Sequence, residues 1–183
     1  MNKIAIWEKL ESYGTEFLEI TPSDNLFKAN STVISMDNGF PNKINYNIEL
    51  NNWFVRNLNL EIPNLGKSLY IETNHDRQWF DKEGNELIEL YGAIDIDISC
   101  TPFTNSLPIN RSKWILNEPQ SFKMVFITIP ELTLKKVDQI YTLIEEGKDY
   151  QRFDYKSGSF HSTIKVDMDG LVIDYPKLFN RIY

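Results

Sequence analysis

Two aspartates separated by one residue, Asp95 and Asp97, are the side chains of this chain best placed to do chemistry. They alternate with isoleucines in the run AIDIDIS (93–99), so on a strand both carboxylates point to one face, roughly 6.5 to 7 Å apart. This spacing suits a metal site, if further ligands are present, or an inverting glycosidase pair with a sugar between the carboxylates. A solvated strand face is the favoured interpretation, because acidic side chains are usually exposed.

Arg56 is the second candidate, because it falls in phase with Phe54 and Leu58 in the strand-like run FVRNLNLEI. Period-two alternation then predicts a guanidinium on the apolar side of its strand. A charge in that position must pair with a carboxylate, reach an edge, or line a cavity that holds a polar ligand group. Pairing with Asp95 or Asp97 and contact with a ligand both stay open, and the two are compatible.

The segment TPFTNSLPINR (101–111) follows the aspartates directly. Each of its prolines lacks a backbone donor, fixes its own φ and biases the preceding residue towards extended geometry. We therefore predict an ordered, extended and polar loop here, neither strand nor helix. Its polar side chains, among them Asn105 and Arg111, could border a binding site.

Period-two alternation dominates the rest of the chain and sets the expected fold class. In Ile44 to Leu50 (INYNIEL) every second residue is apolar, which predicts a strand with one dry and one wet face. Similar runs, separated by turn signals rich in Gly, Asn and Asp, are FVRNLNLEI, SLYIE, ELIELY, AIDIDIS, FKMVFITI, SFHSTIKV and LVIDY. Together they predict an antiparallel all-β architecture, as a barrel, half-barrel or sandwich. The segment 132–144 satisfies both helical and strand spacing, so its type stays open.

Composition narrows the class of protein. The 183 residues show no linker, repeat or low-complexity tract and predict a single domain over 1–183. The net charge of −7 disfavours nucleic acid as a partner. We expect a cytoplasmic protein, because the charged N-terminus lacks the apolar region of a secretion signal and no run of about 18 apolar residues is present.

Known catalytic and cofactor motifs are missing from the chain. It has no G-x-S-x-G elbow, P-loop, dinucleotide glycine fingerprint or H-E-x-x-H helix. The one cysteine, Cys100, is predicted to be a small apolar core residue and not a nucleophile. No catalytic residue, metal or cofactor is therefore assigned.

Four segments taken together resemble the putative glycolipid-binding family of bacterial proteins. They are NNWFVRNL (51–58), GAIDIDISCTPFTNSLPINR (92–111), the Gln139 and Tyr141 pair in DQIYT, and VDMDGLVIDYPKLFNR (166–181). The matching positions of the central pattern are Trp53, Arg56, Gly92, Asp95, Asp97, Thr101, Pro102, Phe103, Thr104, Asn105, Leu107, Pro108, Ile109 and Arg111. Asn110 departs from the pattern, because the family has the first of two arginines there, and the change removes a cation.

The resemblance implies a single curved antiparallel sheet that forms a half-barrel, similar to the periplasmic lipoprotein-carrier proteins, with an apolar concave face. It also favours a strand for 135–143. A lipid or glycolipid would be the ligand, with its acyl chain on the concave face. The expected ligand-binding set is Trp53, Arg56, Asp95, Asp97, Thr104, Asn105, Arg111, Gln139 and Tyr141.

Two alternatives to binding remain. An enzyme of sugar or lipid metabolism would use Asp95 and Asp97 as acid, base or metal ligands, and would raise the pKa of one carboxylate inside a cleft. In the other alternative the polar cluster is purely structural and latches a long loop against the sheet. The sequence leaves the ligand and the oligomeric state open.

Overall fold

The computed structural model describes residues 2–23, 26–37 and 39–183, which are mostly strand. The first seven strands are β1 (Lys3–Lys9), β2 (Gly14–Ser23), β3 (Leu26–Asp37), β4 (Phe40–Asn51), β5 (Phe54–Ile62), β6 (Lys67–Thr73) and β7 (Trp79–Asp81). The last seven are β8 (Asp95–Ile98), β9 (Pro119–Ile127), β10 (Leu134–Glu146), β11 (Gln151–Ser157), β12 (Phe160–Val166), β13 (Val172–Tyr175) and β14 (Phe179–Arg181).

The helical elements are short. They are the 3-10 turns η1 (Pro63–Leu65), η2 (Ile88–Leu90) and η3 (Phe103–Asn105), and the α-helix α1 (Ser106–Arg111). None of the helices in the described residues combines the length and the apolar character that a membrane crossing requires.

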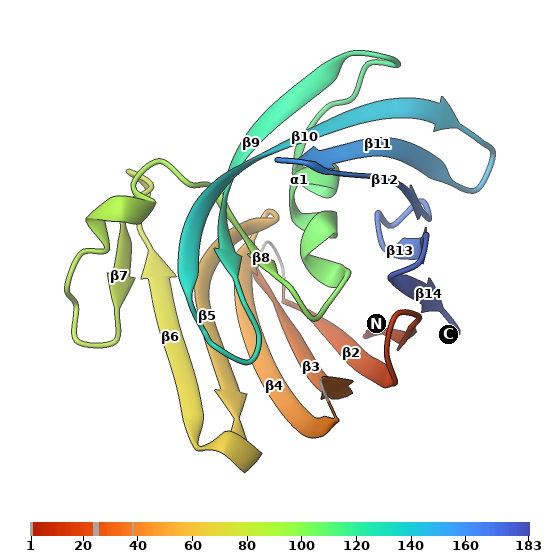
Figure 1. Ribbon diagram of the computed structural model, residues 1–183. Helices are drawn as coiled ribbons and strands as arrows, with labels where there is room; N and C mark the ends of the chain where they lie inside the picture. The colour runs from red at the N-terminus through yellow and green to blue at the C-terminus, as the bar shows by residue number, and fades with distance from the viewer. Residues whose placement is uncertain (1, 24–25, 38) are drawn as a thin grey trace.

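The described strands join edge to edge in one large curved sheet (Figure 1). Their order is β7-β6-β5-β4-β3-β2-β1-β14-β13-β12-β11-β10-β9-β8. The sheet does not close on itself, so the half-barrel is confirmed. From β1 to β7 and from β9 to β14, strands that follow each other in the chain pair antiparallel, and the two halves of the sheet meet where β1 pairs with β14. The pairing of β8 with β9 is parallel, which the antiparallel prediction did not include.

The alternation predicted for Ile44 to Leu50 is confirmed in β4. The four side chains at even positions from 44 to 50 are all buried, whereas those at the odd positions between them are partly exposed. Such a pattern places one face of the strand on the core and the other in solvent. The ambiguous segment 132–144 is also a strand over most of its length, since β10 spans Leu134–Glu146.

A β-bulge in β5 overturns the predicted placement of Arg56. Glu49 of β4 pairs with Asn57, but the next residue, Leu50, pairs with Val55, so Arg56 has no partner opposite it. One extra residue reverses the alternation on its N-terminal side. Val55 is therefore buried, and Phe54 is 47% exposed. Arg56 is half-buried and does not share a face with both Phe54 and Leu58.

The run ELIELY (86–91) is not a strand. Its centre forms the 3-10 turn η2, in which the amide of Tyr91 donates to the carbonyl of Ile88 at 3.1 Å. Leu90 is fully buried, whereas Ile88 is 73% exposed. A run of six residues is too short for the spacing of its apolar side chains to distinguish a strand from a tight turn. The assignment of a strand to this run is therefore wrong.

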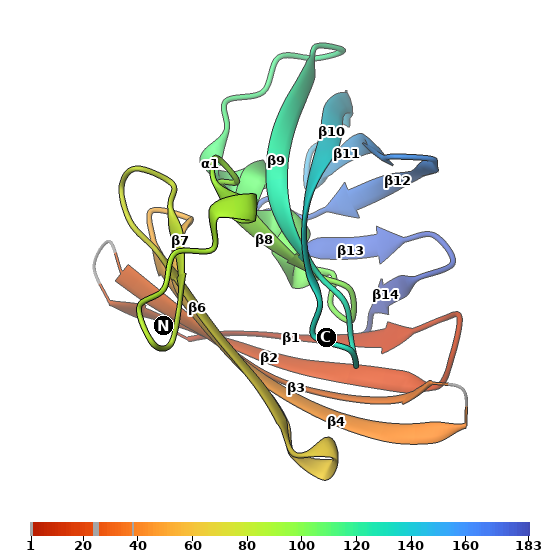
Figure 2. The same cartoon turned by 60° about the vertical axis from the view of Figure 1, so that its left-hand side comes forward.

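The prediction of an extended polar loop over 101–111 is wrong in both conformation and burial. The segment folds into η3 and α1, and residues 101–109 are all buried. Pro108 is the third residue of α1, in the first turn, where its missing amide would have no helical acceptor in any case. We call residues 101–111 the inner segment, because α1 lies within the curve of the sheet (Figures 1 and 2).

The inner segment separates two clusters of buried apolar side chains. Phe103 and Leu107 belong to the cluster that β1–β7 form with β8 and part of β9. Ile109 belongs to the cluster formed with the C-terminal strands, which includes Phe153 and Val172. The concave face is therefore largely filled by the chain itself. Cys100 is buried in the first cluster, as predicted.

Removal of Phe103 tests this packing role. Phe103 is fully buried, so we expect Phe103→Ala to lower the free energy of unfolding by about 3–5 kcal/mol through lost burial and a residual cavity. Urea denaturation followed by tryptophan fluorescence measures the change. The matched control is Phe40→Ala, because Phe40 is 73% exposed, and its effect should stay within about 0.5 kcal/mol. Equal effects of the two changes would contradict the packing role of the inner segment.

Candidate functional site

Asp95 is held by a buried ion pair and not by solvent. It lies on β8 and is fully buried. Arg111, at the end of α1, donates two hydrogen bonds to it, from Nη2 to Oδ2 at 2.6 Å and from Nη1 to Oδ1. The guanidinium also lies 4.8 Å from the centre of the Phe54 ring. Burial raises the pKa of the Asp95 carboxyl, and the contact with Arg111 works against that rise. The predicted solvated strand face is therefore wrong for Asp95.

Asp97 lies on the same strand but has neutral partners. Thr104 Oγ1 of η3 donates to its Oδ1 at 3.1 Å, and Gln139 Nε2 of β10 donates to its Oδ2 at 2.6 Å. Burial raises the pKa of Asp97 above its usual range, while Gln139 and Thr104 oppose the shift. In the described residues, no cation pairs with Asp97 and Asp95 pairs with Arg111, so of the alternatives left open for Arg56 the pairing with these aspartates is not formed.

A second set of hydrogen bonds ties this carboxylate to the inner segment. The Tyr141 hydroxyl donates to Asn105 Oδ1 at 2.9 Å and lies 3.2 Å from Gln139 Oε1. Asn105 Nδ2 in turn donates to the carbonyl of Pro102 at 3.1 Å. Five of the residues expected to bind a ligand are thus joined in one network: Asp97, Thr104, Asn105, Gln139 and Tyr141.

The other expected residues lie elsewhere. Asp95 and Arg111 pair beside the network, whereas Trp53 packs against Phe27 with ring centres 4.8 Å apart. Arg56 lines a separate pocket with Arg77. The residues of the expected ligand-binding set therefore lie at several places in the structure and do not line one common pocket.

A cavity with a volume of about 770 Å³ lies beside the network. We call it the inner cavity. Apolar and aromatic side chains from β8–β10 and from β11–β14 form most of its walls, and they are Ile98, Phe126, Val137, Tyr155, Phe160, Tyr175, Leu178 and Phe179. Gly158 and polar residues complete it, and the polar residues are Asp97, Ser99, Thr101, Asn105, Asp138, Ser157 and Ser159. Of the expected set, Asp97 and Asn105 line it.

The aromatic wall is a continuous series of rings. Tyr155 lies 6.0 Å from Phe160 and 6.1 Å from Tyr175, and Tyr175 lies 6.4 Å from Phe179. Burial raises the pKa of the Tyr155 hydroxyl above its usual range, and the nearby charge of Asp97 adds to the rise. This hydroxyl is therefore protonated near neutral pH. In the part of the chain that the structure describes, no group of three His, Cys, Asp or Glu residues could hold a metal ion.

Comparison with known proteins assigns the family. The model of the family described as "putative glycolipid-binding" matches residues 4–181. The chain belongs to this family. The resemblance inferred from the four sequence segments is thus confirmed over nearly the whole length.

One solved structure similar to this family member is the crystal structure of a DUF1089 family protein from Pseudomonas aeruginosa. The two chains are 28% identical and superpose with a TM-score of 0.78, and the match covers 91% of this chain and 92% of the other. No curated protein sequence matches the chain.

Asn110, where this family member departs from the expected arginine pair, contacts a turn. Its Nδ2 donates to the carbonyl of Asp169 at 2.9 Å, and its side chain packs against Gly170, which has a φ of +71°. A Cβ at position 170 would lie 2.3 Å from Asn110 Nδ2. Asn110 therefore connects the inner segment to the turn between β12 and β13 through a hydrogen bond and a packing contact.

A buried carboxylate that the sequence argument missed lies on β2. Glu16 is 2% exposed, and its Oε1 accepts from Ser31 Oγ at 2.8 Å and from Tyr46 Oη at 2.5 Å. Its Oε2 has no hydrogen-bond partner among the described residues. Burial raises the pKa of Glu16 to about 7. Alternation could have found it, because Glu16 is in phase with Leu18.

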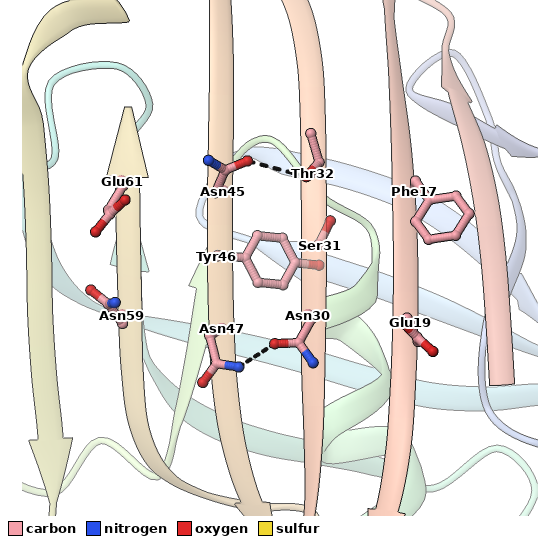
Figure 3. A pocket seen from close by; sticks show the side chains of 10 residues that line it. All are labelled: Phe17, Glu19, Asn30, Ser31, Thr32, Asn45, Tyr46, Asn47, Asn59 and Glu61. Atoms are coloured by element: carbon pink, nitrogen blue, oxygen red, sulfur yellow. Dashed lines mark hydrogen bonds between the residues drawn. The ribbon is translucent and has the colours of Figure 1, made fainter. Parts of the chain in front are cut away.

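The outer face of β2–β5 carries a shallow polar hollow of about 400 Å³ (Figure 3). Its floor has two cross-strand hydrogen bonds, one from Thr32 Oγ1 to Asn45 Oδ1 at 3.1 Å and one from Asn47 to Asn30. These polar side chains alternate along their strands with buried ones such as Tyr46 and Ser31. The hollow is therefore the solvated face of the sheet.

Loss of Arg111 tests the buried pair. We expect Arg111→Met to lower the free energy of unfolding by about 3–5 kcal/mol, because it leaves Asp95 charged and unpaired in the core. The double variant Asp95→Asn/Arg111→Met should recover much of the loss, as measured by urea denaturation. As a control, Arg152→Met removes an exposed pair with Glu145 and should change stability by less than about 1 kcal/mol. Failure of the double variant to recover stability would contradict the role given to the pair.

Glu16 makes stability depend on pH. Its pKa is about 7 in the folded protein and 4.5 for a fully solvated glutamate, so between these values the folded state binds the proton more tightly than the unfolded state. Stability due to this group is full below about pH 4.5, falls as the pH rises, and is lost above about pH 7. Relative to Glu16→Gln, the wild type should lose roughly 3 kcal/mol between pH 4.5 and pH 8. Urea denaturation at both pH values measures the difference, and parallel pH profiles would contradict it.

Proposed function

We propose that the protein binds an amphiphile of the lipid or glycolipid class in the inner cavity. The observation that carries this proposal is a cavity of about 770 Å³ with an aromatic wall and, among its lining residues, a partly buried carboxylate, Asp97, with which no cation pairs in the described residues. Its volume lies within the range of about 300–1,000 Å³ that is usual for small-molecule sites. The apolar part of the ligand lies against Tyr155, Phe160 and Phe179, and its head group lies near Asp97 and Asn105.

Burial of the apolar part supplies most of the affinity. Each methylene removed from water contributes about 0.8 kcal/mol, so a dozen contribute on the order of 10 kcal/mol before the losses of freedom that accompany binding. The rings of Phe160 and Tyr175, whose centres lie 6.3 Å apart, offer flat apolar contact. Few polar contacts are then needed for binding.

The polar part selects the head group. A carboxylate has roughly four acceptor positions, and Asp97 uses one on each oxygen for Thr104 and Gln139. The remaining positions can accept hydrogen bonds from the hydroxyl groups of a sugar. In this proposal Thr104, Gln139 and Tyr141 position Asp97 and Asn105 and do not themselves bind the ligand.

We favour binding over hydrolysis because the two aspartates cannot work as a pair. Both oxygens of Asp95 are taken by Arg111, and Asp95 does not line the inner cavity. A glycosidase needs two carboxyl groups on either side of the sugar. The Asp95–Arg111 pair instead acts as a latch that holds the end of α1 against β8.

A series of alkyl glucosides with increasing chain length, used below their micelle concentrations, tests the proposal. We expect affinity to increase by up to about fourfold for each added methylene, since each transfers apolar surface out of water. Isothermal titration calorimetry measures the dissociation constants, and glucose alone should bind too weakly to detect. An affinity that does not depend on chain length would overturn the proposal.

Two variants localise the ligand. Phe160→Glu places a charge in the cavity wall and should weaken binding of dodecyl glucoside at least about tenfold. Phe40→Glu is the matched control on β4, since Phe40 is exposed and is not among the residues that line the cavity, and it should bind as the wild type does. Asp97→Asn should reduce the preference for an alkyl glucoside over the fatty alcohol of equal length. Equal binding by the Phe160 and Phe40 variants would place the ligand elsewhere.

A further inference from the structure

A second pocket, of about 340 Å³, carries cationic side chains and no carboxylate. It lies at the start of β5 and the end of β6, and its lining residues come from three segments, 51–56, 73–77 and 93–94. Arg56, His75 and Arg77 are its basic side chains. We call it the basic pocket. Its character is unusual for a chain with a net charge of −7.

Among the described residues, the two guanidinium groups of this pocket are the ones without a hydrogen bond or ion pair. Of its five arginines, Arg111, Arg152 and Arg181 each form an ion pair with Asp or Glu. Within residues 2–23, 26–37 and 39–183, neither Arg56 nor Arg77 forms a hydrogen bond or ion pair through its side chain. Both unpaired groups line the same pocket. Five donors on each guanidinium are therefore available to a ligand.

The backbone holds both arginines in unusual positions. Arg56 is the extra residue of the β5 bulge. Arg77 has a φ of +60°, which is uncommon for a residue with a side chain. Asn74 fixes its turn, because Asn74 Oδ1 accepts from the amides of Asp76 and Gln78 at 2.9 and 3.1 Å. The carbonyl of Arg77 also accepts from the amide of Gly92 at 3.1 Å. Backbone strain of this kind is often maintained where it serves a site.

Nearby carboxylates do not neutralise the pocket. Glu49 accepts from Asn57 at 2.9 Å and forms an ion pair with Lys28 at 2.6 Å. Lys28 is the main cause of the lowered pKa of Glu49, and Arg56 adds only a smaller effect of its charge. Asp76, in the same turn as Arg77, is exposed and is not among the lining residues.

We propose that the basic pocket binds the phosphate group of a ligand, through Arg56 and Arg77. Two guanidinium groups can each grip phosphate oxygens with a pair of parallel N–H donors. Asn51, Asn52 and Asn74 add amide groups suited to the hydroxyls of an attached sugar or glycerol. The phosphate belongs to a soluble sugar phosphate or to a lipid head group.

This site is separate from the inner cavity and goes beyond the function proposed for it. Ala93 and Ile94 line the basic pocket, whereas Asp97, Ile98 and Ser99 line the inner cavity. Both pockets therefore include residues of β8 or of the segment just before it. Along an extended chain, residues 94 and 97 are about 10 Å apart. Asp95, which Arg111 binds, lies between these two groups of lining residues in the sequence. Neither site needs the other in order to bind.

Titration with inorganic phosphate and with glucose 6-phosphate tests the proposal. We expect glucose 6-phosphate to bind and glucose not to bind, as measured by calorimetry and by amide shifts in NMR spectra. Arg56→Gln and Arg77→Asn should each weaken binding about tenfold or more; asparagine is chosen at 77 because it tolerates a positive φ. Lys148→Ala, which removes an exposed cation on the β10–β11 hairpin, is the control and should bind as the wild type does.

Vesicles distinguish the two sources of the phosphate. Binding to vesicles of phosphatidylglycerol in phosphatidylcholine, lost on pure phosphatidylcholine and in both arginine variants, would assign the site to a lipid head group. Binding of glucose 6-phosphate without vesicle binding would assign it to a soluble ligand. Absence of both, or equal binding by wild type, Arg56→Gln and Arg77→Asn, would overturn the proposal. The Phe160→Glu variant should keep phosphate binding, so failure of this site and failure of the inner cavity are separable.

Discussion

The structure depends on the need to cover the concave face of an open sheet. Fourteen strands expose a large apolar surface on the inside of their curve, and the inner segment covers it from within. Its attachment is polar: Arg111 binds Asp95, and Thr104 and Asn105 join the network around Asp97 and Tyr141. A helix of six residues is too short to be stable alone. These polar contacts fix where it sits, and they decide how much of the concave face stays open as a cavity.

Much of the fold could be predicted from the sequence, because period two is a local property. The strand at Ile44 to Leu50 and the half-barrel implied by the family resemblance are both confirmed. The predictions failed for the side-chain direction of Arg56 and for the conformation of residues 101–111, where a single residue decides the local structure. The bulge at Arg56 depends on pairing with β4, and only that pairing reveals the extra residue. Pro108 is tolerated in α1 because it falls within the first turn, which cannot be known before the helix start is known.

The candidate site was partly predictable for a different reason. Asp97 and Asn105 were candidates from residue type and spacing, whereas Gln139 and Tyr141 came from the resemblance. The structure joins all four in one network. The aromatic wall could not be predicted, because alternation says which side chains share a face and not which faces meet across a cavity. The burial of Glu16 could have been predicted, since the alternation of residues along β2 places its side chain on the same face as the buried Leu18.

The pairing of β1 with β14 brings the first and last strands of the sheet together at its centre. The amide of Ile6 donates to the carbonyl of Tyr183 at 3.0 Å, so this seam continues to the final residue. Until β14 is in place, β1 therefore pairs with β2 on one side only. Open edges recruit other strands, and non-local pairing is slow. The β1–β14 seam is thus the place where slow pairing leaves a strand edge open to other chains.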